Sequence, residues 1–408
     1  MNEQRSLTIT QEVSTTPERV YLAFTTGHNL TLWFANRAEV DPRPGGRFYA
    51  WWNDETYACG RFVASEAGER IEFTWRGDSD SAPSVVTVAF AATGEGTKVA
   101  VEHRGSDSRG LPDETLERLQ RRWSEGLENL ASVWGMTGID LRQARRPLLG
   151  IYMGDAAEAG TRGLPEGVAG VVVAGAIDGS GAEAIGLTRG DVIVEADGTP
   201  WSRNRSLAPA LRGKQAGDKV PIAYFRDGER IESRLVLSSP PQPPTVPSDP
   251  KALAQQIAVQ YERHTKAADD ILTGVSGDEA ARRPSEDAWS LREVLAHLML
   301  FERSLQQWIS TLVVGQELRA FAITVPARIK ALFSRYGTAE ALQQALASHR
   351  RETVALVEAL PNEFIETPDY VRMGQVLIQE EIHTAVHHDQ LRRTLEAVRD
   401  ANTGGNGA

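Results

Sequence analysis

The sequence predicts a multidomain α+β protein: a mixed helix and sheet domain, then a small β-rich domain, then an all-α four-helix bundle. Three observations lead to this prediction. A stretch with six prolines, residues 238–250, has the composition of an extended spacer and divides the chain. Before it, short strand-like runs alternate with Gly, Pro and Asp turn signals. After it, four long segments have apolar residues at helical spacing.

Length and charge limit the function. At 408 residues we expect two to four domains. A net charge of −11 argues against a nucleic-acid partner and against an anionic membrane surface. The single cysteine excludes an intrachain disulfide, and the N-terminus has no apolar signal region, so we expect a cytoplasmic protein. Nothing in the sequence indicates the oligomeric state.

Residues 1–145 are predicted to form the first domain. A strand at 7–13 precedes a helix that Thr16 caps and Pro17 begins. Turn signals at hairpin distances then separate strands at 47–52, 57–65, 70–75, 84–92 and 97–103. A long helix, 113–136, follows. An antiparallel sheet curved around such a helix would leave a cavity between them.

Three motifs carry a resemblance for this domain: T-P-E-R-V-Y-L-A-F-T-T (16–26), P-G-G-R-F (44–48) and R-W-S-E-G-L-E-N-L (122–130). They resemble the activator-of-Hsp90-ATPase-like branch of the START/polyketide-cyclase-like (SRPBCC) superfamily. The resemblance implies a helix-grip fold and a small apolar ligand. Five aromatic residues either line such a ligand cavity or fill the core: Trp33, Phe48, Trp51, Trp75 and Trp123. No acid–base pair stands out, so we predict no catalysis here.

Residues 146–238 are predicted to form the β-rich domain. The motif G-L-T-R-G-D-V-I-V-E-A-D-G (186–198) resembles PDZ domains of HtrA-like proteases, and Asp227-Gly228 predicts a hairpin turn. The resemblance implies that backbone N–H groups of Leu148, Leu149, Gly150 and Ile151 bind the C-terminal carboxylate of a partner peptide. The motif G-x-S-x-G and an arguable Ser/His/Asp set are absent from the sequence. We expect peptide recruitment here; the alternative is a spacer with an unused groove.

After the linker at 239–250, residues 251–401 are predicted to form the bundle, and 402–408 a disordered tail. Helical patterns cover 250–273, 290–313, 338–359 and 374–401. The segment between the second and third helices, 314–336, is longer than a turn and is expected to form a lid or a cap. In the last helix we expect Ile382 and Val386 to face the core.

Histidines are concentrated in this bundle. His383 and His387 lie four residues apart, so both rings project from one helix face, about 6 Å apart along the axis, and can hold one divalent metal. His297 on an earlier helix is the third candidate, with a coordination position left open. His388 is expected to face solvent, and His264 to lie on a helix surface. A surface or core histidine pair is the alternative to a metal site.

The segments W-S-L-R-E-V-L-A-H-L-M-L-F-E (289–302) and H-T-A-V-H-H-D-Q-L (383–391) resemble the DinB-like family of four-helix bundles. The resemblance implies a three-histidine metal site made of His297, His383 and His387, with Zn, Ni or Fe as the divalent metal. Some relatives use the metal to activate a low-molecular-weight thiol. The candidates that would orient the imidazoles are Glu302, Glu380, Glu381 and Asp389.

Two functions remain open at this point. The first is a metal-dependent thiol transferase or hydrolase of the DinB-like type, acting on a small electrophilic molecule. The second is a non-enzymatic stress or adaptor protein that binds an apolar ligand or client and C-terminal peptides. We assign no catalytic residue from the sequence.

Overall fold

The computed structural model describes residues 6–80, 82–106, 110–154, 165, 168–202, 207–211, 213–286, 288–316 and 324–404. Contacts divide the chain into two compact units, 1–138 with 244–408, and 139–243. The first unit contains the helix-and-sheet domain and the bundle, and the second is β-rich. Among the described residues, every helix is too short or too polar to serve as a membrane span.

The N-terminal domain is built on a seven-stranded antiparallel sheet in the order β1-β7-β6-β5-β4-β3-β2. Its strands are β1 (Ser6–Val13), β2 (Arg37–Val40), β3 (Arg47–Trp51), β4 (Tyr57–Glu66), β5 (Arg70–Gly77), β6 (Ser84–Thr93) and β7 (Gly96–Gly105). The helices are α1 (Pro17–Thr25), α2 (Gly27–Trp33) and α3 (Asp113–Ser132), which continues into the π-helical turn η1 (Val133–Thr137). The sheet-and-helix prediction is confirmed, whereas β2 and α2 were not predicted.

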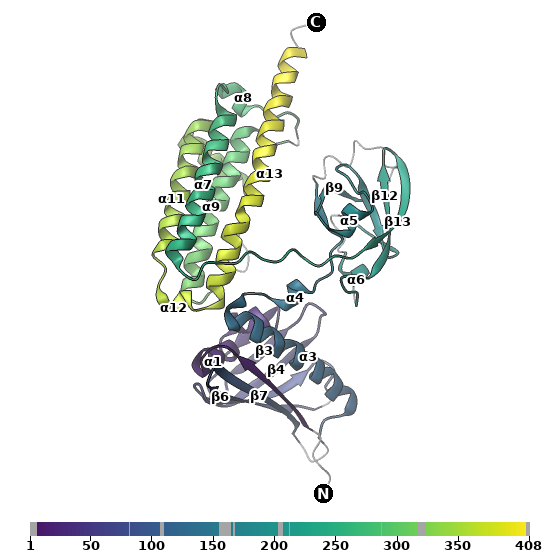
Figure 1. The fold of residues 1–408 in the computed structure, drawn as a ribbon, viewed down its shortest axis with the longest axis vertical. Coiled ribbons are helices and arrows are strands. Elements are labelled where there is room, and N and C mark those ends of the chain that lie inside the picture. Colours follow the sequence, from purple (N-terminus) through teal and green to yellow (C-terminus); the bar gives the residue numbers. More distant parts are fainter. Residues whose placement is uncertain are drawn as a thin grey trace. The chain divides into compact units, whose positions relative to one another are not determined.

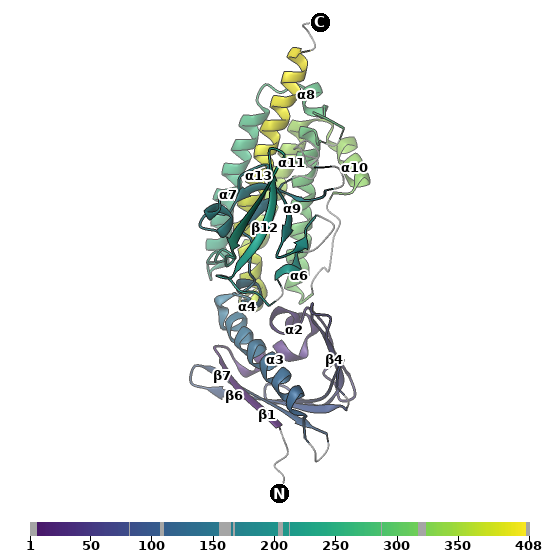
Figure 2. The same cartoon turned by 90° about the vertical axis from the view of Figure 1, so that its right-hand side faces the viewer.

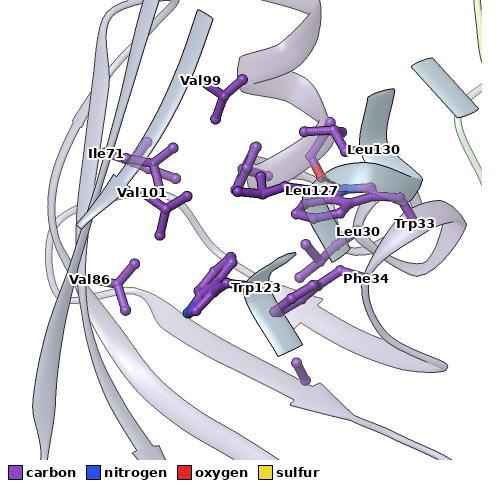
Figure 3. Packing of buried hydrophobic residues seen from close by; sticks show 14 of the residues in the cluster. Leu30, Trp33, Phe34, Ile71, Val86, Val99, Val101, Trp123, Leu127 and Leu130 are labelled. Atoms are coloured by element: carbon purple, nitrogen blue, oxygen red, sulfur yellow. Dashed lines mark hydrogen bonds between the residues drawn. The ribbon is translucent and has the colours of Figure 1, made fainter. Parts of the chain in front are cut away.

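Helix α3 lies across one face of this sheet (Figure 2). Trp123, Leu127 and Leu130 on α3 are almost fully buried against strand residues such as Val86 and Val101 (Figure 3). Burial of each large apolar side chain contributes about 1.5–3 kcal/mol. This one stripe therefore anchors α3 to the sheet.

A buried histidine links α3 to two strands. The indole N–H of Trp123 donates to His103 Nδ1 (3.2 Å), so the ring proton lies on Nε2 and is donated to Ser84 Oγ (2.6 Å). The Ser84 hydroxyl donates in turn to the backbone carbonyl of Trp75 (3.2 Å). Burial lowers the pKa of His103 to about 3. The imidazole is therefore neutral, and both ring nitrogens are hydrogen-bonded.

The second unit contains a six-stranded antiparallel sheet, β13-β12-β10-β9-β8 with β11 beside β10. Its elements are β8 (Ile151–Met153), β9 (Val171–Ala176), β10 (Val192–Ala196), β11 (Thr199–Pro200), β12 (Lys219–Arg226) and β13 (Glu229–Val236), with short helices α4 (Leu141–Ala144), α5 (Gly181–Ala184) and α6 (Ala208–Leu211). The predicted hairpin is confirmed: Asp227 (φ 50°) and Gly228 (φ 85°) join β12 to β13 in the left-handed conformations that a two-residue turn requires.

The C-terminal region is a bundle of four long helices (Figure 1). They are α7 (Pro250–Leu272), α9 (Leu291–Val313), α11 (Ala339–Glu358) and α13 (Pro368–Gly404), with short helices α8 (Gly277–Ala281), α10 (Pro326–Tyr336) and α12 (Asn362–Ile365). Helix α9 begins at a capping box in which the Ser290 hydroxyl and the Glu293 carboxylate satisfy each other's backbone N–H groups. Helix α10 occupies part of the segment expected to be a lid or cap. Residues 317–323 of that segment lie outside the described residues. Helix α13 includes 402–404 of the predicted tail, and the remaining tail residues, 405–408, also lie outside the described residues.

The buried face of α13 differs from the prediction at its centre. Ile382 and Val386 are 56% and 57% exposed, so their assignment to the core was wrong. Glu380, Thr384 and His388 are buried in their place. The spacing of apolar residues gave a wrong prediction for Ile382 and Val386, because this part of α13 has a polar face toward the bundle interior.

His264 on α7 is also buried, and its ring lies 5.3 Å from that of His388. The expectation that both histidines are surface residues was therefore wrong. Their rings pack against each other between two helices of the bundle.

Candidate metal centre

Helices α9 and α13 bring three histidines together. His297 is on α9, and His383 and His387 are one turn apart on α13. The Nε2 atoms of His297 and His383 are 3.4 Å apart, and those of His383 and His387 are 3.1 Å apart. One ligand nitrogen from each ring lies within 4.8 Å of the other two. The rings thus converge on one point, as the spacing and the family resemblance implied.

The spacing of these nitrogens fits a divalent metal. With Zn–N bonds of about 2.0–2.1 Å and tetrahedral angles, two ligand nitrogens are about 3.3 Å apart. The separations of 3.1 and 3.4 Å bracket this distance. Three protein ligands leave a fourth position for water or substrate, the arrangement of catalytic rather than structural sites.

Hydrogen bonds to Nδ1 of each ring determine which nitrogen carries the proton, and they leave Nε2 free to bind a metal. His383 Nδ1 lies 2.9 Å from Glu380 Oε2, and His387 Nδ1 lies 2.8 Å from Gln390 Oε1. Both oxygens are acceptors, so both Nδ1 atoms carry the proton. His297 Nδ1 lies 2.7 Å from Thr324 Oγ1, a hydroxyl that can accept in the same way. Such outer partners typically orient metal-binding imidazoles.

The resulting arrangement favours a cation. With protons on Nδ1, the Nε2 atoms of His383 and His387 present lone pairs to each other across 3.1 Å. Two hydrogen-bond acceptors at such a short distance repel each other unless a positive group lies between them. The chemistry of the donor set therefore fits a divalent metal held by the histidine triad, by which we mean His297, His383 and His387.

The surroundings of His297 and His387 favour their neutral forms. Burial, together with the nearby His387 and His383, lowers the pKa of His297 to about 4. Burial also lowers the pKa of His387. All three side chains are half-buried. The neutral imidazole is the form that binds metals.

Aromatic side chains flank the triad. The ring of Phe301 on α9 lies 4.4 Å from that of His383, and the indole of Trp289 lies 5.2 Å from the ring of His297. Both aromatic residues are half-buried. They give the centre apolar walls beside its polar ligands.

Of the four acidic residues predicted to orient the imidazoles, Glu380 contacts the triad. It is buried, and its second oxygen accepts from the Thr384 hydroxyl (2.6 Å). Glu302 accepts from Tyr261 and Thr353 instead.

The other two acidic candidates form surface ion pairs. Glu381 pairs with Arg263, and Asp389 with Arg393. The sequence analysis did not identify Gln390 or Thr324 as partners of the triad. Gln390 had a usable signal, because it lies three residues after His387, on the same helix face.

The five aromatic residues proposed for a ligand cavity lie in or beside the core of the N-terminal domain. Trp33, Phe48, Trp75 and Trp123 are buried members of that core, and Trp51 is half-buried. The rings of Phe48 and Trp75 are 5.7 Å apart, and those of Trp75 and Trp123 are also 5.7 Å apart. These side chains pack against one another, and a ligand role for them stays a prediction.

The four residues predicted to form a carboxylate-binding loop precede β9 in the second unit. Leu148 forms an isolated antiparallel bridge with Ser238, and Leu149 is buried. Gly150 has φ 85°, and Ile151 begins β8. The positive φ requires glycine, because a side chain there would be strained. Peptide binding by this loop stays a prediction.

Three family models match the chain in sequence order. "Activator of Hsp90 ATPase homolog 1-like protein" matches residues 14–135, "PDZ domain" matches 136–237, and "DinB superfamily" matches 260–395. The histidine triad lies within the last of these ranges.

Among curated proteins, the chain is 34% identical over 99 residues to the serine protease Do-like HtrA of Lactococcus lactis subsp. cremoris. The match covers 23% of this chain, which spans only 24% of that relative's length.

Among solved structures, an HSP90 activator from Plasmodium falciparum is 28% identical, covering 32% of this chain and 96% of its own, with a TM-score of 0.27. A protein from Mesorhizobium loti is 22% identical, covering 31% and 95%, with a TM-score of 0.29. By the three family models, the chain carries, in this order, an activator-of-Hsp90-ATPase-like domain, a PDZ domain and a DinB-like four-helix bundle.

Proposed function

We propose that the bundle is a divalent-metal centre that serves a thiol transferase or hydrolase acting on a small electrophilic molecule. The observation that carries this proposal is the convergence of three half-buried imidazoles, whose Nε2 atoms are 3.1 and 3.4 Å apart in two of the pairs. His297, His383 and His387 would hold Zn, Ni or Fe. The remaining position would take water or a low-molecular-weight thiol.

The residues of the chain have defined roles in this proposal. When bound, the metal supplies Lewis acidity, which lowers the pKa of a coordinated water or thiol. Glu380 and Gln390 hold the protons of His383 and His387 on Nδ1, so that both Nε2 atoms stay available as ligands. Phe301 and Trp289 provide apolar contact surface for an electrophile.

Thiol-dependent turnover tests the proposal. Full-length protein loaded in turn with zinc, nickel or iron would be given a chlorodinitrobenzene with glutathione, mycothiol or bacillithiol, and separately an activated ester. We expect either sulfur to displace chloride from the ring or the ester to be hydrolysed, with His297→Ala at background. His349→Ala is the matched control, because His349 lies on α11 with Glu352 and Arg303 as partners. Equal rates in wild type and His297→Ala, or none above free metal, would contradict the proposal.

The PDZ match favours a second candidate, an adaptor that binds C-terminal peptides. Here the N-terminal domain would hold an apolar ligand or client, and the bundle metal would be structural. Capture of hydrophobic C-terminal peptides by a protein that lacks turnover would favour this candidate. Amidation of the peptide's C-terminus should then abolish capture, because the carboxylate is the group recognised. For either candidate we propose the cytoplasm, since one cysteine gives no intrachain disulfide that needs an oxidising compartment.

A further inference from the structure

The first two turns of α13 contact the N-terminal domain, which belongs to the same compact unit as the bundle. Asp369 accepts a hydrogen bond from His28 Nε2 on α2 over 2.6 Å, and both side chains are buried. Arg19 on α1 donates to the backbone carbonyl of Glu366, just before α13 begins (3.2 Å). A buried carboxylate that loses a donor is costly, so the contact between His28 and Asp369 favours the joined state of the two domains.

Gly138, at the end of η1, touches the same two turns through its backbone. Its carbonyl accepts from Gln375 Nε2 (3.4 Å). A Cβ at Gly138 would lie 2.0 Å from Cγ1 of Val371, which is itself buried. Gly138 also has φ 65°, a left-handed conformation that favours glycine. The N-terminal domain therefore meets α13 at a position where a side chain has no room.

The end of the proline-rich linker packs on these two turns as well. The hydroxyl of Tyr370, a buried residue, donates to the backbone carbonyl of Pro247 (2.7 Å). Gly374 leaves space for Val246, because a Cβ at Gly374 would lie 2.3 Å from Val246 Cγ1. A hydrogen bond and a close packing contact thus hold two successive linker residues. The last part of the linker is fixed to the bundle.

These contacts bring two distant points of the chain to one place. The chain leaves the first unit after Gly138 and returns to it at Pro244. The residues that contact Gly138 and those that contact the linker alternate within positions 370–375 of α13. Six successive helical residues extend over only about 8 Å along the helix axis. Two chain ends that lie this close together are the arrangement that allows one domain to be inserted into another.

We propose that residues 369–375 of α13, which we call the docking face, join the N-terminal domain and the bundle into one body. The docking face holds the N-terminal domain through His28 and Gly138, and the linker through Val246 and Pro247. The middle domain is then an insertion that is attached to this body at one place. A partner that binds the middle domain leaves the other two domains joined. The proposal involves no residue of the histidine triad and does not depend on the metal function.

Distances between spin labels in the full-length protein test whether the two domains form one body. Labels at Glu117→Cys in α3 and Glu358→Cys in α11 report across the domains, since both positions are exposed on long helices. Cys59→Ala removes the native thiol. We expect one narrow distance distribution in double electron–electron resonance. A broad distribution, which two domains that move independently would give, would overturn the proposal.

Gly138→Ala should separate the two domains and broaden this distribution, because the added Cβ meets Val371. Gly45→Ala is the matched control in the same domain. Gly45 also has a positive φ, 81°, but nothing lies within 4 Å of a Cβ there. This control carries similar backbone strain without the contact, so it should keep the narrow distribution. An equally narrow distribution in Gly138→Ala would refute a role for the docking face.

His28→Ala decides if Gly138→Ala does not fold, because it removes one contact from the N-terminal side and leaves α13 intact. Hydrogen–deuterium exchange followed by mass spectrometry should show amides of residues 372–375 exchanging at least about tenfold faster than in wild type. His349→Ala, on α11, is the control and should leave exchange in this segment unchanged. Wild-type exchange in His28→Ala would show that the N-terminal domain does not hold α13.

Discussion

At Glu380 a single buried carboxylate serves two neighbours. One oxygen accepts from His383 Nδ1 and the other from the Thr384 hydroxyl, which also accepts from Arg350. A polar chain therefore runs from the triad into the centre of the bundle. The carboxylate fixes the His383 ring and increases its basicity, which is how outer partners strengthen metal binding.

Glu380→Gln should weaken metal binding by about 10–100-fold, because an amide is a poorer acceptor for His383 and can present its NH₂ group instead. Competition titration against a chromophoric zinc chelator measures the change. Glu381→Gln is the matched control, since its half-exposed carboxylate pairs with Arg263 on the surface. Equal zinc affinity in the two variants would show that Glu380 does not position a ligand.

His103 gives the N-terminal domain a defined response to acid. Its pKa is about 3 when folded and about 6.5 when unfolded, so the unfolded state binds more protons between these values. The full stability is present above pH 6.5 and declines as the pH falls toward 3. At pH 5 the loss should be about 2 kcal/mol.

Urea unfolding followed by tryptophan fluorescence at pH 7 and pH 5 checks this prediction. Trp75 and Trp123 lie beside His103 and report on its surroundings. His103→Gln serves as the control, because it removes the titrating group while keeping a polar side chain. The same pH dependence in wild type and His103→Gln would mean that other groups cause it.

Helix α13 shows how far the sequence could predict an element. The four-residue spacing of His383 and His387 and the resemblance around them identified the triad that the structure brings together. The prediction that Ile382 and Val386 face the core was wrong, because it assumed that the buried face of the helix is apolar. The buried face instead carries Glu380 and Thr384, whose hydrogen bonds offset the cost of burying them.

Other features of the structure that the sequence did not predict also depend on tertiary contacts. Strand β2 is short, with only four residues, and pairs at the sheet edge through β3. Thr324 reaches His297 from a segment 27 residues away in sequence, which no local pattern reveals. Spacing along one helix was readable from the sequence, whereas contacts between separate elements were not.

The exposed and buried faces of α13 predict unequal mutational effects. Leu377→Ala should destabilise the bundle by about 2–5 kcal/mol, because Leu377 is fully buried. Ile382→Ala should change the stability by less than about 0.5 kcal/mol, because the side chain is mostly exposed. Urea unfolding followed by helix circular dichroism measures both. Similar losses would mean that a partner covers the Ile382 face.

At the scale of the whole molecule, three kinds of domain follow one another in one chain. The N-terminal and middle domains have antiparallel sheets, and the bundle alone contains the histidine triad. A metal that binds the triad should therefore stabilise the unit that contains the bundle and leave the middle domain unchanged.

Zinc at about 100 times its dissociation constant should raise the free energy of unfolding of the bundle by about 2.7 kcal/mol. Scanning calorimetry of the full chain, with zinc and with a chelator, separates the transitions. His297→Ala should lose the zinc-dependent shift, while the transition of the middle domain stays in place. A shift that survives His297→Ala would locate zinc elsewhere.

Metal content measured by ICP-MS on untagged full-length protein, after gentle purification and after reconstitution with zinc, nickel or iron, is the most direct test. The geometry of the triad predicts about one tightly bound divalent ion per chain, lost in His297→Ala and retained in His349→Ala. Protein that holds no stoichiometric metal under any of these conditions would contradict it.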